Sequence, residues 1–322
     1  MRAAHMANRA LARTISIGVD LGADLERGWT VAAPDRHFAT CREAGFTAVR
    51  LAVVWAAHTG PAPGYVVDPA ALDHVAALAD AALEAGLAVV VDNHLDPQLM
   101  SDPVAHRDRL LAATRQVATR FASHPPNLVL EPLAEPRDAL DPVWNSYLTE
   151  LVATVREADP DRTLVAGPAF YNTVLQLDAL DLPEDDNLIL TIHQYWPIPF
   201  TMQGEDWFAG NGGWEWLGGG GPNGWLGTTW TGNGGEHAEL EAGYDGVARY
   251  AAARDLPVFV GEFGASNRAE PTARATWARA NRCLAEQHGF AWGWWSLGPT
   301  FAAYNATTGT WDDQLLAALT GP

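Results

Sequence analysis

Cysteine and basic residues are scarce in this chain. Only Cys41 and Cys283 occur among 322 residues, both in segments with a helical pattern, so there is no disulfide framework and no cysteine-based metal motif. We expect two buried free thiols. Arg and Lys number 20 against 39 Asp and Glu, which gives a net charge of −19. That charge repels the phosphates of nucleic acids and of anionic lipids, so we expect neither as a partner.

Long apolar runs are also missing. No stretch approaches the roughly 18 apolar residues of a membrane span. Residues 1–20 contain no apolar segment of about 7 to 15 residues like that of a secretory signal peptide. We therefore expect a cytoplasmic protein, or a secreted one if a leader has been removed.

Apolar residues as a group are plentiful, and Trp is unusually frequent. Apolar residues make up 48% of the chain and charged residues 18%, so the chain can bury a sizeable core. The 14 Trp residues exceed what such a core needs. Trp faces stack on the C–H surfaces of sugars as well as on other rings, so part of this excess indicates a ligand site.

Short apolar runs alternate with longer amphipathic segments from end to end. The predicted strands are residues 14–20, 46–54, 87–94, 127–131, 162–167, 187–193, 256–263 and 290–296. The predicted helices are residues 34–44, 69–85, 101–123, 141–158, 173–180, 236–254, 270–288 and 312–319. Eight such units predict an α/β fold, a (β/α)8 TIM barrel that forms a single domain over residues 1–322. A doubly wound open sheet is the alternative, although no Gly-rich dinucleotide fingerprint follows the first strand.

Residues 196–235 interrupt this alternation with a long connection rich in Gly and Trp. Five Trp residues lie in it: Trp207, Trp214, Trp216, Trp225 and Trp230. Connections this long in a compact domain are usually functional or disordered. Exposing so many Trp side chains is costly, which favours an ordered rim or lid over a disordered coil.

Polar and aromatic side chains mark the carboxyl ends of the predicted strands, which meet at one mouth of a barrel. They are Arg50, His94, Glu135, His193, Tyr195, Glu262 and Trp295. Two Glu residues among cations and hydrogen-bond donors suggest glycoside cleavage, in which one acid protonates the leaving oxygen and the other supports the sugar cation. His94 and His193 lack a third ligand at a recognisable spacing, so we expect no metal and no organic cofactor.

The chain resembles family 5 of the glycoside hydrolases, the cellulase-like retaining enzymes, over nearly its whole length. The resemblance rests on "VRLAVVW", "VVVDNH", "LEPLAEP", "IHQYWPIPFTMQG", "GWLGTTWTG", "PVFVGEFGA" and "WGWWSLGPTFAAYN". It implies that Glu135 is the general acid/base and Glu262 the nucleophile. It also implies that Arg50 and Tyr195 keep Glu262 ionised and that His94, His193, Trp295 and Trp230 contact the substrate, with Trp295 as the floor of the subsite.

One residue departs from the family's Asn-Glu-Pro motif, because Ala134 stands in place of the Asn that binds the sugar's 2-hydroxyl. Met202 also stands where similar sequences often carry His. Three hypotheses follow. The protein is a β-glycosidase acting on a β-linked glucoside, mannoside or short oligosaccharide, or its two acids serve a non-sugar small molecule in a biosynthetic pathway, or it binds carbohydrate with little catalysis. The oligomeric state stays open.

Overall fold

Eight parallel strands form a closed barrel in a computed structural model that describes residues 18–20, 34–210, 217, 220–298 and 301–321. The strands are β1 (Gly18–Asp20), β2 (Ala48–Val53), β3 (Ala88–Asn93), β4 (Leu128–Glu131), β5 (Leu164–Ala166), β6 (Leu188–Gln194), β7 (Val258–Phe263) and β8 (Ala291–Trp294). Each strand pairs with its neighbour in sequence order, and β1 closes the barrel against β8. The predicted TIM barrel is confirmed and the open sheet is wrong; residues 14–17 of the first predicted strand lie outside the described residues.

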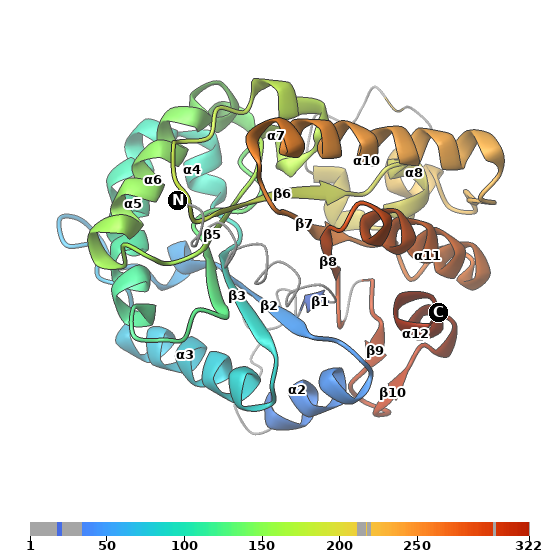
Figure 1. Cartoon of the computed structure of the whole chain (residues 1–322), viewed down its shortest axis with the longest axis horizontal. Helices are drawn as coiled ribbons and strands as arrows, with labels where there is room; N and C mark the ends of the chain where they lie inside the picture. The colour runs from blue at the N-terminus through green and yellow to red at the C-terminus, as the bar shows by residue number, and fades with distance from the viewer. Residues whose placement is uncertain (1–17, 21–33, 211–216, 218–219, 299–300, 322) are drawn as a thin grey trace.

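The helices form a ring around the strands (Figure 1). The α-helices are α2 (Pro34–Glu43), α3 (Pro69–Glu84), α4 (Pro97–Ser101), α5 (Pro103–Phe121), α6 (Trp144–Ala158), α7 (Ala169–Asn172), α8 (Ile198–Thr201), α9 (Gly221–Gly224), α10 (Gly234–Arg254), α11 (Pro271–Gln287) and α12 (Asp313–Thr320). Shorter 3-10 helices are η2 (Trp55–His58), η3 (Asp138–Val143), η4 (Val174–Ala179) and η5 (Asp206–Gly210). A hairpin of β9 (Tyr304–Asn305) and β10 (Thr310–Trp311) precedes α12, and the sequence pattern did not predict it.

Acidic N-caps followed by Pro set several helix starts. Asp68, Asp102 and Glu270 each accept hydrogen bonds from backbone N–H groups of the first turn, and Pro occupies the next position in α3, α5 and α11. The predicted helix 101–123 corresponds to α5, and the short α4 before it, which ends at Ser101 just ahead of the Asp102 cap, was not predicted. Among the described residues, no helix is both long and apolar enough to cross a membrane.

The core of the described residues has three parts. One lies inside the barrel and consists of Ala48, Ala88, Val90, Val129, Val165, Ile189, Phe259 and Ala291. A smaller one consists of Ile198, Met202, Phe208, Trp225 and Phe301. The largest part lies between the strands and the helices. Cys41 belongs to it and is fully buried, and burial raises the pKa of its thiol to about 12. Cys283 is only half-buried, contrary to expectation, because its position on α11 faces partly outward.

The described part of the connection between β6 and α10 is folded. It contains α8, η5 and α9. Gln203, which is fully buried, donates to the carbonyl oxygens of Phe200 and Thr228 and accepts from the backbone N–H of Gly227. These bonds tie the two halves of the connection together, although Trp214 and Trp216 lie outside the described residues.

Candidate active site

The site begins inside the barrel, directly above the apolar interior layer. Side chains alternate between the two faces of a strand, so the second residue after each layer member also points inward. Arg50 follows Ala48 in this way on β2, and Asp92 follows Val90 on β3. Likewise, Glu131 follows Val129 on β4, and Thr191 and His193 follow Ile189 on β6. Regular alternation therefore builds a polar layer at the carboxyl ends of four strands.

Arg50 binds three carboxylates at once. Its Nη2 lies 2.8 Å from Asp92 Oδ2, its Nε 2.7 Å from Glu131 Oε2 and its Nη1 2.7 Å from Glu262 Oε1. None of these four side chains is more than 3% exposed. Burial and the charge of Asp92 raise the pKa of Glu131, although Arg50 acts in the opposite direction. A single cation thus holds the nucleophile candidate and two further acids in place.

Glu262 reaches the interior only because β7 is irregular. Phe259 lies in the interior layer, so strict alternation would direct Glu262 outward. The pairing of β6 with β7 shifts by one residue here, so that Ile192 opposes Val260 while His193 opposes Glu262. Such a bulge re-aims a side chain.

Four neighbours keep Glu262 ionised. Burial alone would raise its pKa, but the positive charges of His193, Arg50 and His94, together with the Tyr195 hydroxyl, lower the pKa to about 2. Tyr195 donates to Glu262 Oε2 over 2.8 Å, and Arg50 occupies Oε1. The sequence-based expectation that Arg50 and Tyr195 hold this carboxylate agrees with these contacts.

Glu135 lies across the mouth from Glu262, with His193 between them. His193 Nδ1 lies 2.9 Å from Glu135 Oε1 and 3.6 Å from Glu262 Oε2. One oxygen from each Glu and one His193 nitrogen all lie within 4.8 Å of one another. Burial would lower the pKa of His193, but Glu262 and the contact with Glu135 raise it. The two predicted acids therefore face a common space.

His94 and Trp295 form one wall of this space. Their rings stack with centroids 5.0 Å apart and an interplanar angle of 10°. His94 Nδ1 lies 2.9 Å from Asp92 Oδ2. Burial would lower the pKa of His94, but the charge and hydrogen bond of Asp92 and the charge of Glu262 raise it to about 9. His94 is thus a cation at neutral pH, and the contacts of Arg50 and His94 link this wall to the Glu262 carboxylate.

A cavity of about 780 Å³ opens above the two acids. Its lining includes Glu135, Glu262, His94, His193, Tyr195 and Trp295. Apolar side chains, among them Leu95, Val174, Leu175, Ile198, Met202 and Phe208, form much of the remaining wall. Six of the predicted site residues therefore meet at one cavity, and Arg50 lies beneath it.

Two predicted contacts do not line this cavity. Trp230 is 3% exposed and packs in the core beside Gly232, so its assignment to the substrate is corrected to a structural one. Ala134 is fully buried, with its N–H donating to the carbonyl oxygen of Asn93. Asn93 lines a different, smaller cavity, so its amide does not take the place of the absent motif amide at this wall.

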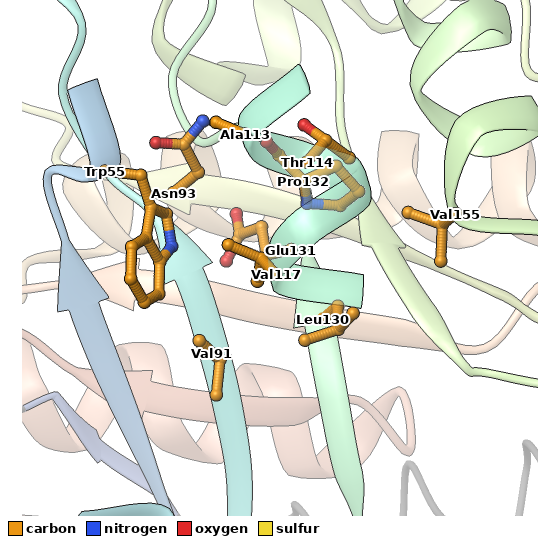
Figure 2. Close-up of a pocket in the computed structure, with 10 residues that line it drawn as sticks. All are labelled: Trp55, Val91, Asn93, Ala113, Thr114, Val117, Leu130, Glu131, Pro132 and Val155. Carbon is orange, nitrogen blue, oxygen red and sulfur yellow. Dashed lines mark hydrogen bonds between the residues drawn. The ribbon is translucent and has the colours of Figure 1, made fainter. Parts of the chain in front are cut away.

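Asn93 borders a separate, small cavity between the barrel and α5 (Figure 2). Trp55, Thr114 and Glu131 also line it, and its volume is about 20 Å³. That is room for about one water molecule. A sugar ring does not fit there.

Sequence reasoning missed three buried residues of the site. Asp92 and Glu131 carried a usable signal, since each is an acid at an inward position of an otherwise apolar strand. Asn172, whose Oδ1 accepts from the backbone N–H of Glu135 over 2.7 Å, carried none. The group Glu135, His193 and Glu262 also has the spacing of a metal site, but Arg50 and Tyr195 already donate to both oxygens of Glu262.

Comparisons with known proteins agree with this geometry. The sequence profile of the family described as "Cellulase (glycosyl hydrolase family 5)" matches residues 23–300. Endoglucanase H of Acetivibrio thermocellus is 27% identical over 97% of this chain, and cellulase/esterase CelE of the same organism is 27% identical over 94%. The matches cover 33% and 38% of those two relatives, so the chain spans about a third of their length.

Solved structures match over the full barrel. An endoglucanase has a TM-score of 0.91 and 28% identity, with 98% of this chain and 100% of that chain covered. Thermotoga maritima Cel5A, solved in complex with cellobiose, has a TM-score of 0.90 and 30% identity, with 97% and 99% covered.

Proposed function

The chain belongs to glycosyl hydrolase family 5, and from this premise we propose that it is a retaining β-glycosidase acting on a β-linked glucoside, mannoside or short oligosaccharide. The observation that carries the proposal is the pair Glu135 and Glu262, with carboxyl oxygens within 4.8 Å of each other. Retaining enzymes hold their two carboxyl groups about 5 to 5.5 Å apart, whereas inverting enzymes leave about 6.5 to 9.5 Å for a water molecule. The shorter separation supports the retaining route.

In the first step, the Glu262 carboxylate attacks the anomeric carbon while Glu135 donates a proton to the leaving oxygen. The bond to the leaving group breaks and a glycosyl ester forms on Glu262. In the second step, Glu135 takes a proton from water, the water oxygen attacks the same carbon, and Glu262 leaves as a carboxylate. The low pKa of Glu262 suits both roles, since it is an ionised nucleophile at neutral pH and a good leaving group.

The neighbours of the pair divide the remaining work. Arg50 and Tyr195 orient Glu262 through both of its oxygens. Trp295 offers a ring face to the sugar, as stacking of sugars on Trp requires. His193 contacts both acids, so its own protonation can adjust as the charges on Glu135 and Glu262 change during the reaction.

The aglycone is proposed to lie over Glu135, because that residue protonates the leaving oxygen. Val174, Leu175 and Tyr171 line the cavity near the end of β5, the strand next to Glu135. Val174 and Leu175 offer aliphatic contacts and Tyr171 offers a ring face, so this side can hold an aryl or alkyl leaving group as well as a second sugar ring. The non-sugar alternative keeps one supporting observation, the loss of the motif amide at Ala134.

The test is hydrolysis of a panel of aryl β-glucosides, β-mannosides and β-cellobiosides, with release of the phenol as the signal. We expect wild-type turnover of at least one member and a loss of at least about 10³-fold in E262Q. E157Q, which changes an exposed acid, should leave the rate unchanged. If no glycoside is turned over, the glycosidase proposal fails and the non-sugar hypothesis is favoured.

A further inference from the structure

The loop that carries Glu135 has an unusual backbone. Glu135 itself adopts φ 48°, in the left-handed region that few residues other than Gly occupy. Four backbone groups around it are hydrogen-bonded. The N–H of Ala134 donates to Asn93 O, the N–H of Glu135 to Asn172 Oδ1, while Glu135 O accepts from Arg137 and Pro136 O from the N–H of Tyr171. Outside contacts therefore define this strained conformation.

The segment that makes two of these contacts is itself strained. Phe170, Tyr171 and Asn172, at the end of α7, have φ values of 53°, 62° and 55°, a left-handed turn of three residues without a Gly. Such a turn persists only where its surroundings over-determine it. The N–H of Phe170 donates to Asp141 Oδ1 over 2.8 Å, which anchors the start of the turn to η3.

Asn172 joins the two strained segments. Its side chain is fully buried, its Oδ1 accepts from the N–H of Glu135 over 2.7 Å, and its Nδ2 donates to Pro168 O over 3.0 Å. Gly167 leaves the space for it, because a Cβ there would lie 2.5 Å from Nδ2. Trp144 fixes Gly167 in turn by donating to its carbonyl oxygen over 2.9 Å.

We infer that Asn172 is a positioning residue for the acid/base: its amide fixes the backbone of Glu135 so that the carboxyl group meets His193 and the leaving oxygen. The expected loss of glycosidase activity rests on the proposed function. The expected displacement of Glu135 rests on the hydrogen bonds alone. Asn172 does not touch the substrate, since it is fully buried and does not line the cavity. Misplacing a catalytic group by about 1 Å can cost roughly a hundredfold in rate.

The test compares N172L with N281L, a matched control. Asn281, on α11, is also fully buried, and its amide likewise accepts one hydrogen bond, from Tyr244, and donates one, to Trp277 O. Each variant is assayed with a phenyl and a 2,4-dinitrophenyl β-glycoside of the sugar that the wild type accepts. The dinitrophenyl group leaves as the anion without protonation, whereas the phenyl leaving group requires a proton from the general acid.

We expect N172L to lose about 100-fold in kcat/KM with the phenyl glycoside and less than about 10-fold with the dinitrophenyl glycoside. N281L should lose the same small factor with both. An equal loss for both substrates in N172L, or a profile like that of N281L, would overturn the inference.

N172D adds a second readout. A protonated carboxyl group can accept from Glu135 N–H and donate to Pro168 O, as the amide does, whereas the ionised form sets a negative charge against a carbonyl oxygen. The activity of N172D relative to wild type should therefore be greatest at acidic pH and fall as pH rises. A ratio that is independent of pH contradicts the inference.

Crystal structures separate this inference from the proposed function. In N172L we expect the 2.9 Å contact between Glu135 and His193 to be lost, with the barrel unchanged. If Glu135 keeps its position, the inference is wrong even where the enzyme hydrolyses glycosides. If the wild type hydrolyses none, the proposed function fails and the position of Glu135 in N172L still decides the inference.

Discussion

Replacing Arg50 by Met would remove the cation that contacts three buried acids. R50M keeps most of the side-chain volume but leaves Asp92, Glu131 and Glu262 without their shared partner. Removing one member of a buried charge pair costs about 3 to 5 kcal/mol, against a total stability of about 5 to 15 kcal/mol for a typical protein. We expect the free energy of unfolding at pH 7 to fall by about 3 kcal/mol or more.

The pH dependence of R50M carries the sharper test. The pKa of Glu262 is lowered from 4.5 to about 2, so its contribution to stability is present above pH 4.5 and is lost as the pH falls through 2. Without Arg50 the pKa of Glu262 rises. The stability deficit of R50M should therefore shrink as the pH is lowered, and the acidic limb of its kcat/KM profile should move to higher pH.

Urea unfolding followed by Trp fluorescence measures the first effect, and the pH–rate profile measures the second. R115M is the matched control, because Arg115 and Glu157 form an exposed pair at 50% and 63% exposure, which should contribute under about 1 kcal/mol. R50K keeps a positive charge but lacks the guanidinium group that reaches three acids. Its free energy of unfolding should therefore lie between those of R50M and the wild type. An R50M variant with the small loss of R115M and an unmoved acidic limb would refute the reasoning.

Three further predictions concern the mouth of the barrel. A134N should raise kcat/KM at least about tenfold for a β-glucoside but not for its 2-deoxy analogue. It should also lower the free energy of unfolding by about 1 to 3 kcal/mol, because Ala134 is fully buried. Equal effects on both substrates would contradict a contact with the 2-hydroxyl. W295A should raise KM or lower kcat/KM at least about tenfold, whereas W230A should mainly lower the melting temperature. Kinetics and calorimetry of both variants check this. The reverse pattern would contradict the assignment of Trp295 to the substrate and of Trp230 to the core. His94, with its pKa raised to about 9, should stabilise the fold below pH 6.5 and lose that contribution as the pH rises through 9. NMR titration of the His94 ring measures this pKa, and a value near 6.5 would contradict the prediction. D92N should lower the pKa of His94.

The sequence pattern was sufficient for the barrel because strand and helix periods alternate eight times. It was insufficient for the site wherever position depended on a local irregularity. Strict alternation would turn Glu262 outward, and only the shift in pairing opposite His193 brings it inside. The same limit applied to the stretch "NLVLEPLAEP", which contains two acids, Glu131 beside Arg50 and Glu135 at the cavity. Periodicity alone does not tell which of these two acids binds Arg50 and which faces the cavity.

Long-range packing accounts for the other differences. Trp230 lies in a connection that appeared to be a rim, yet it packs into the core beside Gly232. Asn172 belongs to a left-handed turn that no pattern of residue types indicates, and its bond to Glu135 joins residues 37 positions apart. Localisation and the absence of a cofactor stay predictions.

Trapping the covalent intermediate tests the central claim most directly. A 2-deoxy-2-fluoro β-glycoside with a dinitrophenyl leaving group slows both steps and lets a glycosyl ester accumulate. Mass spectrometry of the intact protein and of its peptides should find one fluoroglycosyl group, attached to the peptide that contains Glu262. An adduct on another residue, or hydrolysis of the parent glycoside with inversion at the anomeric carbon and no adduct, would contradict the account.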